Sequence, residues 1–476
     1  MDSLAHAVAE GATGEQLLAE PVPADYLAAH LRREDVGMFR GIADKDVRKS
    51  IRVGYVPMPE LAPDEVLVAV MASSINFNTV WSATFEPVPT FGMLSRFARQ
   101  GGFAARHDRD HQVIGSDASG VVVRAGSGVR HWKPGDHVVV SPVYVDDQEP
   151  LTHHDGMLGA GQLAWGYETN FGGLATYAVV RASQVLPKPA HLTWEESACF
   201  ALCAGTAYRM LVGEHGARIK QGDIVLIWGA TGGLGAFAVQ LVKNGGGIAV
   251  GIVGSEAKAG LARRLGCDLV INREELPDTG EPDLAARSQA VGKHIGRIIR
   301  AGLGEDPHVV FDHVGRETFG ASVFVVRRGG VVVTCGSTTG YQHQFDNRYL
   351  WMNLKRIIGS HGVNYSELAE CTRLFRQGML RPVLSATYPL AETGEAARLV
   401  QLNEHVGKVA VTCLAPEPGL GVTDPRARER AGIERWHETV GPAGGRPGRS
   451  RPDRAVRPAP APAPALPSLT RKATPI

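Results

Sequence analysis

A single carboxylate, Glu168, stands among aromatic, amide and glycine residues in the segment AWGYETNFGG, residues 164–173. The segment follows neither the alternation of a strand nor the period of an amphipathic helix, so packing alone does not explain it. A carboxylate in such surroundings can orient a hydrogen-bond donor or an ordered water beside a reacting group. The alternative is a surface turn whose glutamate points into water.

A second chemical feature is a glycine-rich loop, IWGATGGLGAFAVQ at residues 227–240. Glycines in such a loop let the backbone approach a pyrophosphate, which then lies at the positive end of the following helix. The loop alone is a weak signal, but a strand before it, a helix after it and a second strand ending about 20 residues later give the required context. The segment predicts a dinucleotide site whose expected contacts include Ala230, Thr231, Gly232, Gly233 and Leu234.

The end of the second strand indicates which dinucleotide binds. An NAD site usually has a carboxylate there to accept hydrogen bonds from the ribose, whereas this chain has Ser255 followed by Lys258. A hydroxyl and a cation suit a 2′-phosphate, so we expect NADPH as the cofactor. Glu256 is discordant, and Lys258 could instead be a solvated helix residue. The expected cofactor contacts are completed by Thr206, Arg273 and Gly336.

No metal site is expected. The phrase WKPGDHVV (132–139) resembles the medium-chain dehydrogenase/reductase superfamily, but its zinc alcohol dehydrogenases carry Gly-His-Glu where this chain reads Gly115-Ser116-Asp117. The four-cysteine lobe of those enzymes is absent from the sequence, and the 17 histidines show no ligand spacing. Without a Lewis acid, hydride chemistry needs a substrate that is already activated, such as a carbonyl-conjugated alkene. These features indicate an enoyl reductase.

Four separated segments carry a more specific resemblance: SSINFNTVWSATFEPV (73–88), AWGYETNFGG (164–173), GRETFGASV (315–323) and DNRYLWMNLKRIIGSH (346–361). Together they resemble the crotonyl-CoA carboxylase/reductase family, and the similarity covers most of the chain apart from its two ends. Members of this family reductively carboxylate 2-enoyl-CoA thioesters. Hydride from NADPH reaches the β-carbon, and the resulting enolate attacks CO₂ to give an alkylmalonyl-CoA.

The resemblance implies that Asn78, Tyr167, Glu168 and His361 hold carbon dioxide. Because CO₂ has no net charge, a few placed donors in a dry pocket must hold it, and such a pocket also excludes water that would protonate the enolate. Asn78 and His361 can donate hydrogen bonds, and Glu168 can orient the histidine or a bridging water. The family usually has Phe where this chain has Tyr167, which puts the ratio of carboxylation to simple reduction in doubt.

Two small residues bear on the acyl chain. Crotonyl-type members usually carry Ile and Phe where this chain has Ala164 and Gly362, so we expect room for a medium-chain 2-enoyl-CoA of about six to ten carbons, such as octenoyl-CoA. Compensating bulk elsewhere in the pocket is the alternative. For the nucleotide end of coenzyme A, the resemblance nominates Arg348, and Tyr349 reaching a neighbouring subunit. A structural ion pair is the alternative for Arg348.

Two kinds of element must position these residues. Strand-like segments punctuated by Gly, Pro and Asp dominate residues 51–185, as in a β-rich, barrel-like domain. From about residue 222, fully apolar strands alternate with helical stretches, which predicts a doubly wound parallel sheet. Residues 273–291 are polar and unpatterned and suggest an insertion, and one or two helices follow residue 363. We expect a last strand at 408–414 to rejoin the first domain.

We therefore predict an α/β fold with a GroES-like β-rich catalytic domain, a Rossmann domain and a proline-rich tail that contains PAPAPAPALP. The predicted parts are residues 1–215 for the first section of the catalytic domain, 216–360 for the NADPH-binding domain, 361–440 for the return to the catalytic domain, and 441–476 for a disordered tail.

Composition excludes several classes of protein. At 476 residues the chain suits two domains with additional segments, and a net charge of +1 gives no basis for a nucleic-acid partner. The sequence shows neither a signal-peptide pattern nor an apolar run of about 18 residues, so we expect no membrane association. Cys199 and Cys203 stand at helical spacing in an apolar run, which suits buried thiols in the cytoplasm.

Two other functions remain open. A plain NADPH-dependent enoyl-thioester or quinone reductase would have no use for Asn78, Glu168 and His361 together. A non-catalytic dinucleotide-binding protein would show a degraded glycine loop or no polar pocket, and the sequence shows neither sign. The resemblance further implies a homo-oligomer, a tetramer or a dimer, and a role in supplying extender units for polyketide assembly.

Overall fold

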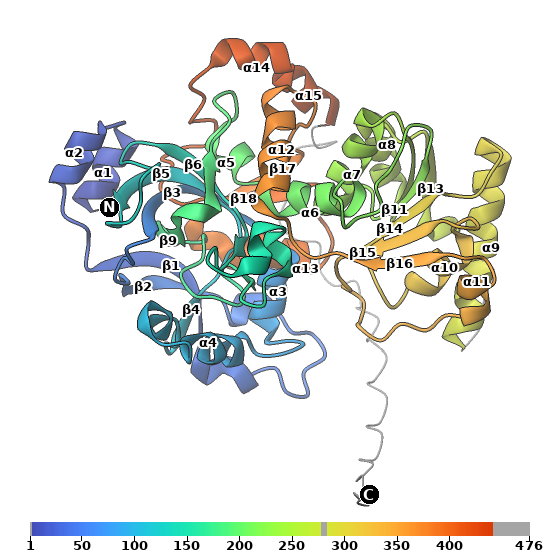
Figure 1. The fold of residues 1–476 in the computed structure, drawn as a ribbon, viewed down its shortest axis with the longest axis horizontal. Helices are drawn as coiled ribbons and strands as arrows, with labels where there is room; N and C mark the ends of the chain where they lie inside the picture. Colours follow the sequence, from blue (N-terminus) through green and yellow to red (C-terminus); the bar gives the residue numbers. More distant parts are fainter. Residues whose placement is uncertain (1, 278–282, 441–476) are drawn as a thin grey trace, which may run out of the picture.

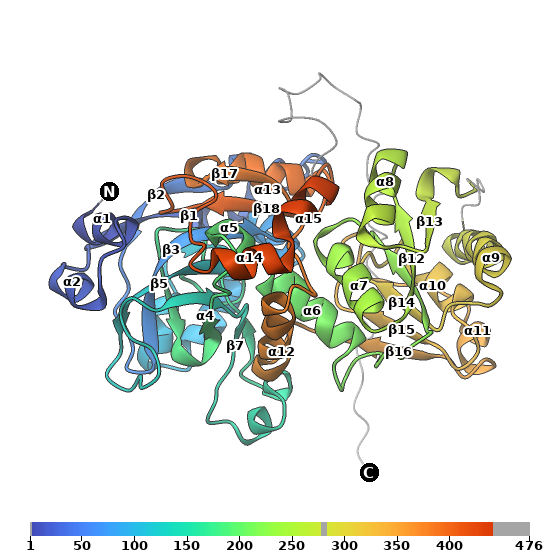
Figure 2. The ribbon, with the colours of Figure 1, turned by 90° about the horizontal axis from the view of Figure 1, so that it is seen from above.

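The computed structural model describes residues 2–277 and 283–440, which form two lobes side by side (Figure 1). We call them the β-rich lobe and the parallel-sheet lobe. Helices α6 (Ala201–Leu211) and α12 (Tyr365–Arg376) lie between the two lobes in both views (Figures 1 and 2). The predicted tail, residues 441–476, lies outside the described residues.

The β-rich lobe is built on a seven-stranded sheet with the order β10-β6-β5-β3-β18-β17, in which β9 also pairs with β3. Its central strand β3 is buried along its whole length, because its side chains alternate between two hydrophobic clusters, one on each face of the strand. The strands are β3 (Glu65–Ile75), β5 (Ala118–Ala125), β6 (His137–Val140), β9 (Tyr177–Arg181), β10 (Val185–Pro187), β17 (Leu384–Pro389) and β18 (Lys408–Thr412).

Two smaller sheets complete this lobe. A three-stranded sheet has the order β2-β1-β4, and β7 pairs with β8. Their bounds are β1 (Asp25–Arg32), β2 (Arg52–Pro57), β4 (His111–Val113), β7 (Val143–Tyr144) and β8 (Leu163–Ala164). The helices of the lobe, besides α6 and α12, are α1 (Ser3–Ala9), α2 (Gly14–Ala19), α3 (Phe77–Thr84), α4 (Thr90–Ala98), α5 (Trp194–Ser197), α13 (Thr393–Gln401), α14 (Pro425–Ala431) and α15 (Ile433–Val440).

The parallel-sheet lobe contains six parallel strands in the order β13-β12-β11-β14-β15-β16. Strand β11 is buried at every residue, and its side chains alternate between two hydrophobic clusters, one on each face of the sheet. The strands are β11 (Ile224–Trp228), β12 (Ile248–Val253), β13 (Leu269–Asn272), β14 (Val309–Asp312), β15 (Val331–Thr334) and β16 (Arg356–Gly359). The helices are α7 (Gly233–Asn244), α8 (Glu256–Leu265), α9 (Leu284–Leu303), α10 (Phe319–Val325) and α11 (Asn347–Trp351).

The predicted fold class is confirmed for the described residues, including the return of the last strand, since Ala410 of β18 pairs with Ser74 of β3. Two expectations about local structure differ from the structure. Residues 284–291, part of the stretch expected to be unpatterned, form the start of helix α9, which buries Ile295 and Ile299 at helical spacing further along. After residue 363 the chain forms strand β17 and helices α12 to α15, more than the one or two helices expected.

The last two helices are anchored by a buried carboxylate. Glu196 of α5 accepts hydrogen bonds from Arg428 of α14 at 2.7 and 3.0 Å and contacts His437 of α15 at 2.7 Å. Although burial opposes ionisation, the hydrogen bonds from His437 and Arg428 lower the pKa of Glu196 to about 2. Of the helices in residues 2–277 and 283–440, none is long and apolar enough to cross a membrane.

Candidate active site

A chain of hydrogen bonds joins α3 to the turn that carries Glu168. Asn78 Nδ2 donates to Ser116 Oγ at 2.8 Å, and Ser116 Oγ donates to the carbonyl oxygen of Trp165 at 2.6 Å. Because the single hydroxyl proton of Ser116 is used on Trp165, Ser116 must accept from Asn78, which fixes the orientation of the amide. Asn78 Oδ1 is buried, and no partner among the described residues reaches it. A ligand at this point can therefore contact an amide that is already oriented.

The turn itself is held by Glu168. Its Oε2 accepts from the backbone N–H of Ala164 at 2.8 Å, and its own N–H donates to the Ala164 carbonyl at 2.8 Å. Gly166 has φ +68°, and a Cβ there would lie 2.0 Å from the carbonyl oxygen of Gly115, so only glycine fits this approach. Glu168 is half-buried and does not simply point into water.

Tyr167 and His361 are placed differently from one another. Burial, reinforced by Tyr341 and Glu168, raises the pKa of Tyr167 to about 12, so its phenol is neutral at physiological pH. His361 follows β16, is exposed, and has no hydrogen bond to Asn78, Tyr167 or Glu168. Its neighbour Gly362 packs against Val143, the strand partner of Ala164, which brings the histidine to the same side of the site as the Glu168 turn.

The glycine loop lies where the strand order of the parallel sheet reverses, between β11 and β14, which is the position of dinucleotide sites in such sheets. Helix α7 starts at Gly233 with Gly232 as its N-cap, and a Cβ on Gly235 would lie 2.1 Å from the Gly229 carbonyl oxygen. The N–H of Gly407 donates to the Thr231 carbonyl at 2.7 Å, so the loop is also tied to the start of β18.

The end of β12 gathers the predicted phosphate contacts. Ser255 caps α8, and Lys258 Nζ donates to the Asn403 carbonyl at 2.9 Å. Arg273 lies against Gly254, with a guanidinium nitrogen 3.6 Å from where a Cβ would be. Burial and then the charge of Arg273 lower the pKa of Lys258. An anion bound beside these two cations would stabilise the charge of both side chains. Residues of this type fit the 2′-phosphate of NADPH.

The remaining cofactor predictions and the discordant acid are also placed. Glu256 is exposed and pairs with Arg263 of its own helix at 3.1 Å, so its charge is neutralised there. Thr206 is buried on α6, and Gly336 follows the carboxyl end of β15, on the same edge of the sheet as the glycine loop.

Comparison with known proteins gives the family. A family model described as "Zinc-binding dehydrogenase" matches residues 233–377, and one described as "Alcohol dehydrogenase GroES-like domain" matches residues 62–190. The chain is 50% identical over 420 residues to crotonyl-CoA reductase of Streptomyces collinus, covering 88% of this chain and 94% of that protein. It is 37% identical over 410 residues to crotonyl-CoA carboxylase/reductase of Cereibacter sphaeroides, covering 84% and 90%. The chain belongs to the crotonyl-CoA carboxylase/reductase family.

Among solved structures, the chain is similar to the 2-octenoyl-CoA carboxylase reductase CinF from a Streptomyces species, in complex with NADP and 2-octenoyl-CoA. The sequence identity is 62% and the TM-score is 0.89, with coverage of 93% of this chain and 98% of that one. The crotonyl-CoA carboxylase/reductase AntE in complex with NADP is 37% identical, with a TM-score of 0.73 and coverage of 83% and 96%.

The residues of this carboxylase/reductase family member do not fit the zinc ion that the name of one family model implies. Ser116 uses its hydroxyl between Asn78 and Trp165, and Asp117 accepts from the buried Lys408 at 3.2 Å and from Asn76 Nδ2 at 2.8 Å. In the described part of the chain, no group of three or more His, Cys, Asp or Glu side chains is arranged to hold a metal ion.

The two small residues nominated for the acyl chain do converge. Val143 and Ala164 are opposite one another in the β7–β8 pair, so their side chains lie on one face. A Cβ on Gly362 would lie 3.0 Å from Val143 Cγ2 and 3.0 Å from Met157 Cε. Gly362 also has φ +52°, a backbone reason for glycine that the sequence did not reveal.

The predicted coenzyme A contacts lie at the far end of the parallel-sheet lobe, on α11 (Figure 1). Arg348 forms an ion pair with Asp346 at 2.6 Å, and its side chain is 75% exposed. Its contact in the structure is thus the ion pair that was the alternative to coenzyme A binding. Tyr349 packs edge-on against Phe324 at 4.6 Å, and its hydroxyl accepts from Gln289. Within the single chain, Tyr349 therefore packs against its own lobe, and its reach to a neighbouring subunit stays a prediction.

Sequence reasoning missed the residues that support the site. Ser116 and Asp117 were noted only as replacements of zinc ligands. In the structure, Ser116 links Asn78 to the Glu168 turn, and Asp117 accepts a hydrogen bond from Lys408. Lys408 is 2% exposed, and a lysine at the start of a fully apolar strand was a signal that it has a buried partner.

Proposed function

We propose that this protein catalyses the NADPH-dependent reductive carboxylation of a medium-chain 2-enoyl-CoA, such as 2-octenoyl-CoA, to an alkylmalonyl-CoA. The observation that carries the proposal is the oriented Asn78 amide, which shares Ser116 with the Glu168 turn and leaves a buried Oδ1 without a partner in the described residues. The similarity to a protein bound to NADP and 2-octenoyl-CoA supports the cofactor and the substrate class.

The cofactor position follows from the parallel sheet. The glycine loop and the positive end of α7 suit the pyrophosphate, while Ser255, Lys258 and Arg273 suit the 2′-phosphate. When bound, NADPH supplies a hydride for the β-carbon of the enoyl thioester. Gly336, which follows β15 at the same edge, and Thr206 of α6 complete the proposed contacts.

The pocket beside Asn78 would then decide the fate of the enolate. The second N–H of the Asn78 amide has no acceptor in residues 2–277 and 283–440 and can donate to a CO₂ oxygen, and the exposed His361 can supply another donor. Glu168 acts through the backbone of Ala164, holding the turn that presents Tyr167. The oriented amide of Asn78 can stabilise the carboxylate as it forms without offering a strong acid to the enolate.

Product partition tests this function. NADPH oxidation with 2-octenoyl-CoA, with and without bicarbonate, followed by product mass, should show alkylmalonyl-CoA as the main product of the wild type. Glu168→Ala and His361→Ala should shift the product toward the simply reduced acyl-CoA, while Glu256→Ala, an exposed acid near the cofactor, should not. Wild-type formation of the reduced acyl-CoA alone would favour the plain enoyl reductase.

We also propose a homo-oligomer, a dimer or tetramer, in the cytoplasm, acting without zinc and supplying polyketide extender units. The parallel sheet supports the oligomer, because β16 is an edge strand flanked by the exposed residues Trp351, Met352 and Leu354. The described cysteines are free, and most are buried, which suits a reducing compartment. Sedimentation of the purified chain tests the oligomeric state.

A further inference from the structure

Two aromatic side chains meet between the lobes. The ring of Trp81, on α3, lies 6.1 Å from the ring of Tyr341, which follows β15, with an angle of 48° between the planes. The ring of Phe77 also packs edge-on against Trp81, at 5.4 Å. Because Trp81 is three residues after Asn78, the two side chains share a face of α3. The aromatic contact therefore borders the proposed CO₂ pocket.

Tyr341 projects from a loop whose two ends are fixed. Thr339 donates to the Val314 carbonyl through both its N–H and its Oγ1, at 2.9 and 2.8 Å. On the other side, the ring of His343 lies 4.3 Å from that of Phe319. Gly340 between them has φ +128°, which turns the chain outward. With 50% of its surface exposed, Tyr341 is held out from its own lobe toward Trp81.

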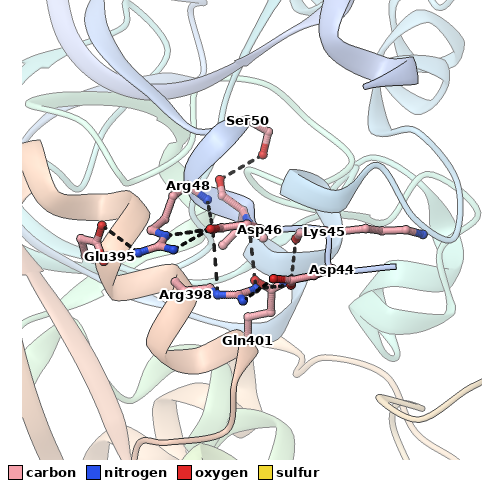
Figure 3. A network of polar contacts seen from close by, with 9 residues as sticks. Asp44, Lys45, Asp46, Arg48, Ser50, Glu395, Arg398 and Gln401 are labelled. Carbon is pink, nitrogen blue, oxygen red and sulfur yellow. Dashed lines mark hydrogen bonds and ion pairs between the residues drawn. The ribbon is translucent and has the colours of Figure 1, made fainter. Parts of the chain in front are cut away.

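The helix that carries Trp81 is braced from behind. Ser50 Oγ donates to the Ala83 carbonyl of α3 at 2.6 Å, and Lys45 pairs with Glu86 just after the helix. Figure 3 shows how the segment containing Lys45 and Ser50 is itself fixed to α13, through Arg48 with Glu395 at 3.3 Å and through Asp44 with Arg398 at 2.9 Å. The helix that presents Trp81 is therefore held in place from the side of the β-rich lobe.

Tyr341 also has an electrostatic influence on the proposed carboxylation residues, since after burial it is the next cause that raises the pKa of Tyr167. Burial and then Glu86 raise the pKa of Tyr341, so this side chain is neutral. One neutral ring from the parallel-sheet lobe therefore lies against Trp81 of the β-rich lobe.

We propose that Tyr341 is a closing residue, whose ring seats on Trp81 and shields the pocket of Asn78 and the Glu168 turn from water. This inference rests on the proposed function. The α-carbon of the enolate either forms a carbon–carbon bond with CO₂ or takes a proton from water, which leaves hydroxide. Shielding removes the second route without touching the reacting atoms, so Tyr341 is a positioning residue and leaves the hydride step unchanged.

Three variants test this role at saturating NADPH and 2-octenoyl-CoA with fixed bicarbonate. Tyr341→Ala should raise the ratio of octanoyl-CoA to alkylmalonyl-CoA by roughly two- to tenfold, the range that one aromatic pair contributes, with KM for NADPH unchanged. Tyr341→Phe keeps the ring and should retain the wild-type ratio. Tyr55→Ala removes a more exposed tyrosine of β2 and is the matched control.

The reaction in D₂O identifies the proton source, because the additional octanoyl-CoA of Tyr341→Ala should carry deuterium at the α-carbon. An unchanged product ratio in Tyr341→Ala, or the same rise in Tyr341→Phe, would overturn the inference. A wild type that forms no alkylmalonyl-CoA would instead overturn the proposed function, so the two failures are distinguishable.

Discussion

Replacing Ala164 by isoleucine should shift the preferred substrate from a medium to a short acyl chain. Ala164 and Val143 are cross-strand partners with side chains on one face, and Val143 contacts the position where a Gly362 side chain would begin. Ala164 is half-buried and lies in a regular strand, so a β-branched residue suits its backbone. The added carbons would occupy the space that we assign to the end of the acyl chain.

The expected size of the effect follows from the burial of methylene groups. An octenoyl chain has about four more carbons than a crotonyl chain, and at about 0.8 kcal/mol each their burial contributes about 3 kcal/mol, or roughly a hundredfold in kcat/KM. Isoleucine adds about three carbons to alanine, so it should remove most of this preference. We expect the kcat/KM for 2-octenoyl-CoA to fall roughly fiftyfold, and that for crotonyl-CoA to change only a few-fold.

Steady-state NADPH oxidation with both substrates, in the presence of bicarbonate, measures the ratio directly. Gly362→Ala is the matched control, because φ +52° and a Cβ 3.0 Å from Met157 and Val143 strain the variant whatever the substrate. It should lower Tm and affect both substrates alike, and phenylalanine at this position would confound size with strain. The reasoning is refuted if the wild type prefers crotonyl-CoA, or if Ala164→Ile loses both activities equally.

Other predictions concern cofactor, partition and stability. Lys258→Ala should raise the KM for NADPH roughly ten- to hundredfold and leave the KM for NADH nearly unchanged. The control Arg263→Ala, on the same helix, should alter neither KM. Equal losses for both cofactors would place Lys258 away from the 2′-phosphate. Tyr167→Phe should raise the carboxylated fraction of product, and an unchanged fraction would show that the hydroxyl admits no water. Because the pKa of Glu196 is lowered from 4.5 to about 2, its stabilisation is present above pH 4.5 and lost as pH falls through 2. Glu196→Gln should therefore lower the free energy of unfolding by about 3 kcal/mol at neutral pH. In urea unfolding, the stability of this variant should fall less steeply than that of the wild type as the pH is lowered into the acid range, and an equally steep fall would contradict this assignment.

The sequence predicted the parallel sheet because strands buried on both faces read as continuous apolar runs, and β11 is such a strand. It did not reveal β17, whose residues are half-buried and carry no clear alternation. Helix α9 was hidden because the polar residues at its start precede the apolar spacing of Ile295 and Ile299. Signals of this kind are local, and each failure occurred where partners distant in the chain decide the structure.

For the candidate site, the residue types were predictable and their connections were not. The glycine loop and the acid at 168 stand out in the sequence, but the hydrogen bond from Asn78 to Ser116 joins residues on two separate segments. The orientation of Tyr349 toward Phe324 and the positive φ of Gly362 likewise depend on the folded backbone. The roles of the named CO₂ and cofactor residues remain predictions for the experiments above.

The return of the chain to its first sheet has a consequence for synthesis on the ribosome. Strand β3 emerges early, but its neighbour β18 emerges only after the entire parallel-sheet lobe. The parallel sheet is contiguous in sequence and can fold as it leaves the ribosome, whereas the edge of β3 awaits a partner throughout. Since β18 also begins with Lys408, the buried partner of Asp117, the candidate active site gains this support only after the parallel-sheet lobe has been synthesised.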